Sequence, residues 1–209
     1  MPDDALELVE VEVDEGPPAA GRSPLEARPL VLTFRNGSDE PAVLTGVKVV
    51  VHDTYKLVTC GLPEGGGEES TYNYDFIFPD DTSSAWTGTG SRNFSVAPHS
   101  VEALSVTIGP DRSGNLLLWR FSLYGSFKGG REVHWGDGVG IEGFDVSVAQ
   151  YERYAAGSGP MGAPEDMRRC GAETADQIRA FAQPNPASPQ LVYPLVQRLI
   201  AGYEALAQG

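Results

Sequence analysis

The chain has 209 residues, a formal net charge of −14 and 41% hydrophobic side chains. This length allows one sizeable core and a small appendage. An acidic chain with three lysines repels phosphate groups, so neither nucleic acid nor an anionic membrane is expected as a partner. No apolar run approaches the roughly 20 residues of a membrane helix, and the acidic N-terminus is unlike a signal peptide, so we expect a cytoplasmic protein.

The remaining composition indicates the source and the state of the cysteines. Arginine outnumbers lysine by 12 to 3, and alanine, glycine and proline are frequent, which is typical of a bacterial protein from a GC-rich genome. The two cysteines, Cys60 and Cys170, lie far apart and make no metal-ligand spacing. In a reducing compartment they are expected to be free thiols.

The first strand pattern lies in residues 6–13, where the apolar set changes phase after Leu8. This change predicts either a β-bulge or a strand with both faces partly covered. A stronger pattern spans residues 30–52. Leu30 and Phe34 share one face of an extended run, and a second run of alternating valines follows Pro41. The gap between the two runs is longer than a two-residue hairpin, so they either pair with each other or lie in two facing sheets.

Strand-like runs continue to about residue 149. They cover residues 55–60, 72–78, 94–96, 104–108, 115–127, 131–135 and 139–148. The polar segment 79–93, which carries Trp86, is expected to be a long loop. Turn residues separate the runs about every ten residues, which predicts a mainly β protein with an antiparallel β-sandwich of about eight or nine strands.

One part of this pattern resembles a known class of domains. Residues 94–108 (FSVAPHSVEALSVTI), followed by a Gly-Pro-Asp turn and an aromatic strand, resemble immunoglobulin-like and fibronectin-type-III-like sandwiches. The resemblance implies an Ig-like sandwich domain over residues 1–149. The paired cysteines and central tryptophan of true immunoglobulin domains are absent, so the resemblance implies a fold and no function.

Residues 150–209 are expected to form a helical extension of two short helices joined by a proline-rich linker. The first helix follows Pro164, and its less polar side chains recur every three or four residues: Met167, Cys170, Thr174, Ile178 and Phe181. The second spans residues 194–207 and carries a stripe of Leu195, Leu199, Tyr203 and Leu206. Helices this short are marginal alone, so they must dock on the sandwich or on a partner. The stripe is therefore a candidate surface for a protein partner or for homo-oligomer formation.

The aromatic residues suggest a second kind of site. Tyr72 and Tyr74 begin an alternating aromatic row, and Trp86 is expected to be partly exposed. Aromatic rings beside Asp and Asn side chains suit a carbohydrate or another small polar ligand. Trp86, Tyr72 and Tyr74 are therefore candidate ligand-binding residues.

Two histidines lie near aspartates and are candidates for a hydrolase site. His52 precedes Asp53, and His134 lies three residues before Asp137. A general base needs both an orienting carboxylate and a nucleophile within reach. Neither pair is followed by a Gly-x-Ser-x-Gly elbow or a signature cysteine, so no catalytic residue is predicted.

Motifs for phosphates and metals are also missing from the sequence. There is no Walker A lysine and no GxGxxG between a strand and a helix. Asp75, Asp80 and Asp81 lack the spacing of a dedicated calcium loop, so no metal and no cofactor are expected. The sequence favours a non-enzymatic intracellular binding or interaction module for a protein partner. Alternatives are a sandwich that binds carbohydrate or another small polar ligand, and a hydrolase with a His–Asp site.

Overall fold

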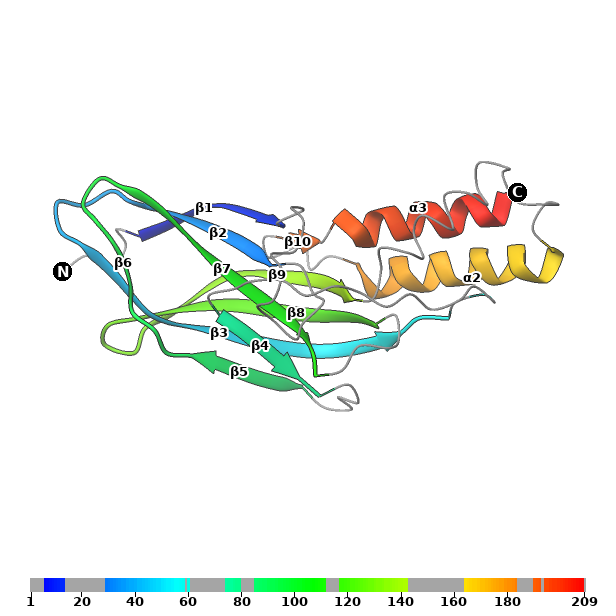
Figure 1. Cartoon of the computed structure of the whole chain (residues 1–209), viewed down its shortest axis with the longest axis horizontal. Coiled ribbons are helices and arrows are strands. Elements are labelled where there is room, and N and C mark those ends of the chain that lie inside the picture. Colours follow the sequence, from blue (N-terminus) through cyan, green and yellow to red (C-terminus); the bar gives the residue numbers. More distant parts are fainter. Residues whose placement is uncertain are drawn as a thin grey trace, which may run out of the picture.

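The computed structural model describes residues 6–13, 29–58, 60, 74–79, 85–111, 117–142, 164–183, 190–192 and 194–208. Two β-sheets pack face to face, and a pair of helices extends the long axis of the molecule beyond one end of the sheets (Figure 1). The predicted mainly β fold with a helical C-terminal extension is confirmed.

The first sheet has four strands in the order β1 (Leu6–Val13), β2 (Leu30–Asn36), β7 (Val101–Pro110) and β4 (Tyr74–Phe78). β2 is antiparallel to both neighbours, whereas β4 is parallel to β7. The register between β1 and β2 shifts between Leu8 and Glu10, which favours the bulge of the two interpretations that the sequence left open.

The second sheet has β10 (Gln190–Val192), β9 (Glu132–Glu142), β8 (Leu117–Phe127), β3 (Ala42–Lys56) and β5 (Trp86–Gly90), in that order. A short strand, β6 (Phe94–Val96), also pairs with β3. β10 runs parallel to β9 and follows the predicted linker directly, while the other pairs are antiparallel.

The two strands of residues 30–52 belong to different sheets. β2 lies in the four-stranded sheet and β3 in the six-stranded sheet, which decides between the two arrangements that the sequence left open. Leu32 and Phe34 from one strand and Val49 and Val51 from the other are fully buried in one core. Alternation along each strand directs these side chains inward.

Large aromatic rings fill the core where glycines leave room for them. A Cβ built on Gly140 would lie 2.3 Å from the Trp119 ring, and one on Gly125 would lie 1.9 Å from the Trp135 ring. Trp119 is fully buried, as its alternation with apolar neighbours predicts. The glycines of β8 and β9 are therefore part of the core packing.

Three of the predicted strand boundaries are wrong. Residues 86–90 are not loop but strand β5, because small Gly and Thr residues there pair with β3 beneath the aromatic rings of β4. Residues 55–60 are not a separate strand, since β3 continues to Lys56. The runs at 131–135 and 139–148 form one strand up to Glu142, and residues 143–148 lie outside the described part.

The two predicted helices are confirmed as α2 (Glu165–Phe181) and α3 (Pro194–Gln208). They lie side by side and run in opposite directions (Figure 1). Ile178 of α2 and Leu199 and Tyr203 of α3 are fully buried. Among the described segments, no helix combines the length and the apolar character that crossing a bilayer requires.

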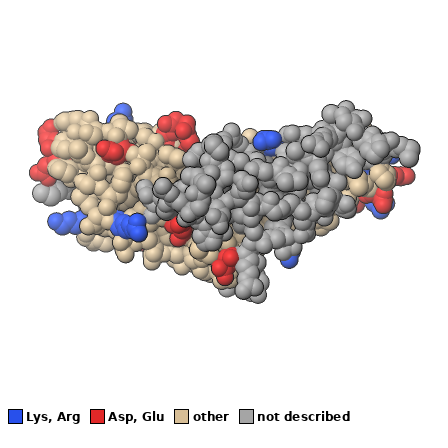
Figure 2. Space-filling model, viewed as in Figure 1, with Lys and Arg blue, Asp and Glu red and all other residues tan. Residues whose placement is uncertain are grey.

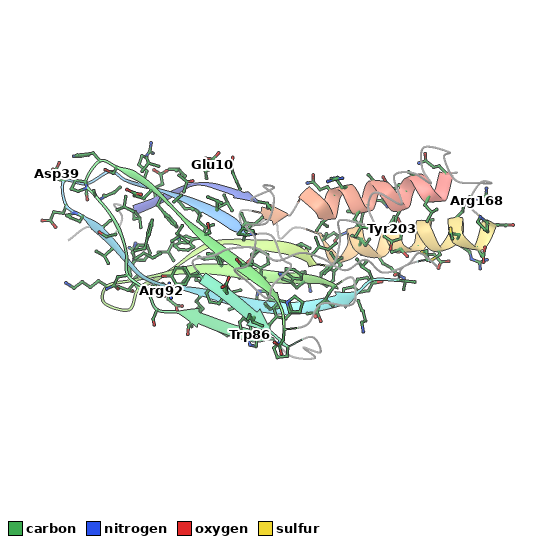
Figure 3. All side chains as sticks on the ribbon, viewed as in Figure 1. Glu10, Asp39, Trp86, Arg92, Arg168 and Tyr203 are labelled. Atoms are coloured by element: carbon green, nitrogen blue, oxygen red, sulfur yellow. A yellow bond between two sulfur atoms is a disulfide. The ribbon has the colours of Figure 1, made fainter. Side chains whose placement is uncertain are left out.

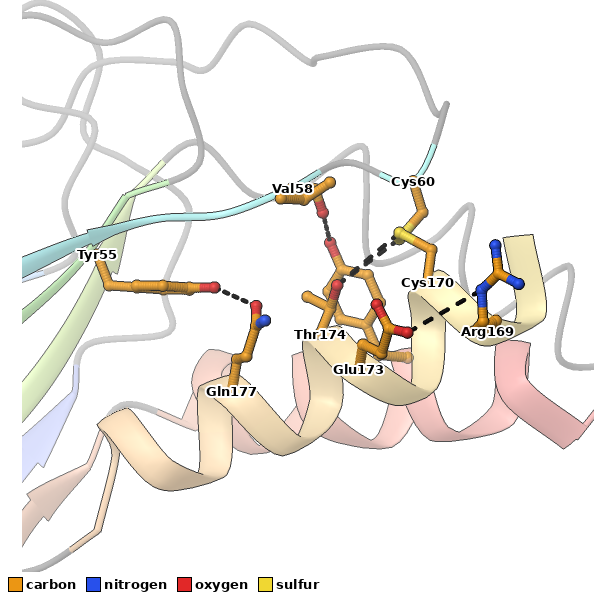
Figure 4. Close-up of a disulfide and its surroundings, with 9 residues drawn as sticks. Tyr55, Val58, Cys60, Arg169, Cys170, Glu173, Thr174 and Gln177 are labelled. Atoms are coloured by element: carbon orange, nitrogen blue, oxygen red, sulfur yellow. Dashed lines mark hydrogen bonds and ion pairs between the residues drawn. A yellow bond between two sulfur atoms is a disulfide. The ribbon is translucent and has the colours of Figure 1, made fainter. Parts of the chain in front are cut away.

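The prediction of free thiols is wrong, because Cys60 and Cys170 form a disulfide (Figure 4). Their Cα atoms lie 5.9 Å apart although 110 residues separate them in the sequence. Cys60 follows β3 and Cys170 lies in α2, so a tertiary contact, which has no signature in the cysteine spacing, brings the two sulfurs together.

On the face of the molecule that Figure 2 shows, acidic and basic side chains are scattered over the described part of the sandwich. No broad basic area appears among those residues.

Candidate functional site

A hollow of about 450 Å³ lies on the outer face of the six-stranded sheet, next to the C-terminal end of α2. Strands β3, β8 and β9 supply its floor, and Gln183, which follows α2, lines it from the side of the helices. The polar side chains that the strands contribute are His52, Arg120, Ser122, Tyr124, His134 and Asp137.

Strand alternation and two irregularities direct these side chains outward. In β8, Ser122 and Tyr124 alternate with Phe121 and Leu123, which are fully buried in the core. The register of β3 against β8 shifts at His52, between Val51 and Asp53, and that of β9 against β8 shifts next to His134. Bulges re-aim side chains in this way and often occur beside functional sites.

Four of the residues form a continuous chain of hydrogen bonds, called here the histidine–aspartate chain: His52, Ser122, Asp137 and His134. The Ser122 hydroxyl donates to Oδ1 of Asp137 at 2.5 Å. His52 Nε2 lies 2.6 Å from the Ser122 oxygen, and His134 Nε2 lies 2.9 Å from Oδ1 of Asp137.

The proton positions in this chain follow from the donor inventory. A serine hydroxyl has one proton, and here it is given to a carboxylate, which can only accept. The Ser122 oxygen therefore accepts from His52, and Asp137 accepts from His134, so both imidazoles carry a proton on Nε2. In the neutral ring the remaining nitrogen, Nδ1, is an acceptor.

The four side chains of the histidine–aspartate chain differ in how exposed they are. Ser122 is 3% exposed, whereas the side chains of Asp137 and His134 are 23% and 36% exposed. His52 is exposed as well. The hydroxyl is thus enclosed between its partners, while the imidazole rings are the parts that a molecule in the hollow can touch.

Each cation beside the hollow is paired with an acid. Arg120 forms an ion pair with Asp53, and Lys48 forms one with Glu132. These pairs are partly solvated and are worth little in stability, but they balance the charge beside the carboxylate of Asp137. The hollow is therefore polar without a strong excess of positive charge.

The aromatic rings near the hollow have charged or aromatic neighbours. The Lys48 ammonium lies 4.5 Å from the centre of the Tyr124 ring, and the His134 ring lies 4.9 Å from it. The centre of the Phe181 ring, at the end of α2, lies 5.3 Å from Cζ of Arg120 and 5.7 Å from the centre of the Tyr55 ring. Tyr55, Tyr124 and Phe181 are all half-buried, and each ring already has a charged or aromatic group beside it.

Only one of the two predicted His–Asp pairs is joined by a hydrogen bond in the structure. His134 and Asp137 are hydrogen-bonded, whereas His52 bonds to Ser122 and its sequence neighbour Asp53 bonds to Arg120. Sequence reasoning missed Ser122 and Arg120. The only sequence signal for them is their outward phase on an otherwise apolar strand.

Of the predicted aromatic ligand residues, the structure describes Trp86 and Tyr74, and neither lines the hollow. Trp86 is half-buried at the start of β5, and its ring packs against Phe78. It lies far from Tyr203, which belongs to the other candidate surface, the stripe of α3 (Figure 3). Tyr74 is 7% exposed and its hydroxyl donates to the Arg92 carbonyl at 2.6 Å. Burial raises the pKa of the Tyr74 hydroxyl. Tyr72 lies outside the described residues.

The stripe of α3 faces its own chain. Leu199, Tyr203 and Leu206 are at most 1% exposed, and α3 packs along α2. The side chain of Leu195 is outside the described part. The three described residues of the stripe are therefore used within the helical pair.

The acidic residues do not gather into a metal centre in the described part of the chain, where no group of three or more His, Cys, Asp and Glu side chains could hold a metal ion. Burial raises the pKa of Asp75, and the neighbouring Thr107 side chain partly opposes this shift. Asp80 and Asp81 lie outside the described residues.

Comparison with known proteins adds no relative. The chain matches no known protein family, no curated protein and no solved structure.

Proposed function

We propose that this protein is a non-enzymatic binding module that takes up a small polar molecule in the hollow on the six-stranded sheet. The observation that carries the proposal is the histidine–aspartate chain on its floor. The volume of about 450 Å³ falls within the range of small-molecule sites, roughly 300–1,000 Å³.

The chemistry of the floor favours a ligand with hydrogen-bond donors. Ser122 and Asp137 hold both imidazoles with the proton on Nε2, so in the neutral rings each Nδ1 can accept from a hydroxyl or amino group. The Tyr124 ring is already flanked by Lys48 and His134. Recognition by hydrogen bonds therefore fits better than stacking, and a sugar, a polyol or a similar neutral molecule is the best candidate.

The same geometry supports binding over hydrolysis. In a serine hydrolase a histidine lies between the serine and the carboxylate, so that it can take the hydroxyl proton. Here Asp137 bonds directly to Ser122, and His52 is a donor to the hydroxyl oxygen. Ser122 is also 3% exposed, which disfavours attack on a substrate.

A partner-binding role for α3 has less support. Its described stripe residues are buried within the chain, so a partner could reach them only after this packing opened. The packing of two sheets supports an immunoglobulin-like sandwich, and the disulfide supports an oxidising compartment in place of the cytoplasm expected from the sequence. We include both in the proposal.

The test is calorimetric titration of the full chain with a panel of sugars, polyols and amino acids. We expect at least one class to bind. His134→Ala and Ser122→Ala should then weaken binding about tenfold, which corresponds to one lost hydrogen bond. The matched controls are His99→Ala and Ser95→Ala, both exposed and outside the hollow. A panel without a binder, or binding that survives both hollow variants, would contradict the proposal.

A further inference from the structure

A short segment after β3, called here the strap and described at Leu57, Val58 and Cys60, connects the sandwich to both helices (Figure 4). The Val58 carbonyl accepts a hydrogen bond of 2.6 Å from the hydroxyl of Tyr203 on α3. Cys60 is bonded to Cys170 of α2. Leu57 and Cys60 are buried, at 7% and 8% exposure.

The helix that the disulfide holds also ends beside the hollow. Phe181 and Gln183, at the end of α2, lie against Arg120 and in the hollow lining. Tyr55 adds a hydrogen bond to Gln177 and a ring contact with Phe181. The disulfide adds a covalent link between α2 and the strap.

The backbone of Cys60 adopts an unfavourable conformation that its surroundings must stabilise. Its φ of 48° is in the left-handed region, which costs free energy for a residue other than glycine. The disulfide and the packing of the strap must offset this cost. Cys170 is half-buried, so a reductant can reach its sulfur more easily than that of Cys60.

We propose that the Cys60–Cys170 disulfide is a redox latch that holds α2 against the sheet, and that its reduction by a dithiol releases the strap and opens the hollow. The inference rests on the proposed function for the role of the hollow, and concerns how access to it is regulated. The strap, α2 and the hollow form one connected path through Cys170, Phe181 and Gln183.

The reaction is a balanced thiol–disulfide exchange. A thiolate of the dithiol attacks Sγ of Cys170, the sulfur–sulfur bond breaks, and Cys60 leaves as a thiolate that takes up a proton. The hydroxyl of Thr174 lies 3.7 Å from Cys60 Sγ and 4.0 Å from Cys170 Sγ, where it can stabilise the leaving thiolate. The second thiol of the reductant then displaces Cys170 and becomes part of a cyclic disulfide. Two electrons and two protons are transferred to the protein.

The test compares the oxidised full chain with a Cys60→Ser, Cys170→Ser double variant, using diethyl pyrocarbonate as the probe of histidine accessibility. Both proteins lack thiols that would consume the probe. We expect modification of His52 and His134 to be about threefold faster in the variant, with His99 unchanged as the internal control. Amide exchange in α2 should be roughly tenfold faster, with exchange in β8 unchanged.

Equal labelling of His52 and His134 in two folded proteins would overturn the latch. If the double variant does not fold, the native chain is reduced with dithiothreitol, alkylated with iodoacetamide and measured in the same way. Loss of protection in β8 would then identify the disulfide as a stabiliser of the whole fold, which also overturns the latch. The labelling needs no ligand, so the latch and the proposed function can fail independently.

Discussion

Replacement of Asn36 by alanine tests how the turns at one end of the sandwich are held. Asn36 is fully buried, and its amide nitrogen donates to the carbonyls of Glu40, Val96 and Ala97 at 2.8, 3.0 and 3.2 Å. Its oxygen accepts from the backbone N–H of Ser38 at 3.0 Å and from the Ser38 hydroxyl at 2.8 Å. One side chain thus joins the turn after β2 to the chain after β6.

The size of the effect follows from these contacts. Each hydrogen bond contributes about 1 kcal/mol net, and a buried carbonyl left without a donor costs about 1–3 kcal/mol. The bond between Asn36 and the Val96 carbonyl is buried, so the alanine variant pays this second cost at that position. We expect a loss of about 3 kcal/mol in the free energy of unfolding, or roughly 10 °C in Tm for a chain of this length.

Urea denaturation of the oxidised protein measures this loss, with Asn93→Ala as the control. Asn93 is exposed just before β6, so its replacement should change stability by less than about 0.5 kcal/mol. Equal stability of the two variants would refute the reasoning that Asn36 ties the turns together.

Three other substitutions test separate parts of the structure. Gly140→Ala places a methyl group 2.3 Å from the Trp119 ring and should lower the free energy of unfolding, measured by urea denaturation, by about 1–3 kcal/mol. Gly37→Ala is the control: a methyl group there would meet no neighbouring atom within 4 Å, so the variant should be nearly as stable as the native chain. Tyr203→Phe removes the hydrogen bond to the strap and should cost about 1 kcal/mol; no change would show that this bond does not hold the strap. Because burial raises the pKa of Asp75 above 3.8, its protonated form is favoured by folding, and this contribution is present at low pH and is lost as the pH rises through the raised pKa. Asp75→Asn should remove that component from a series of urea midpoints across this range, and an unchanged pH profile would contradict the assignment.

Local patterns in the sequence predict much of the fold. The period of two identifies β2 and β3, the phase change after Leu8 identifies the bulge in β1, and the spacing of three and four identifies α2 and α3. Strand β5 is missed because Gly88 and Gly90 have weak strand propensity, and the pairing with β3 makes this segment a strand.

Long-range contacts account for what the sequence does not predict. His134 and Asp137 are three residues apart, so their contact can be expected, but Ser122 meets His52 and Asp137 only through the registers of β3, β8 and β9. The disulfide likewise depends on tertiary contact across 110 residues. Strand register and helix docking are set by the whole core, so no local pattern carries them.

The most direct test of the ligand site is long-range proton–nitrogen NMR of the histidine side chains, recorded with and without the panel of sugars, polyols and amino acids. We predict that His52 and His134 both carry the proton on Nε2, and that a bound ligand shifts their Nδ1 resonances while His99 stays unchanged. A ligand that shifts only the Trp86 indole or His99, or a panel that shifts none of these signals, would contradict the assignment of the hollow as the binding site.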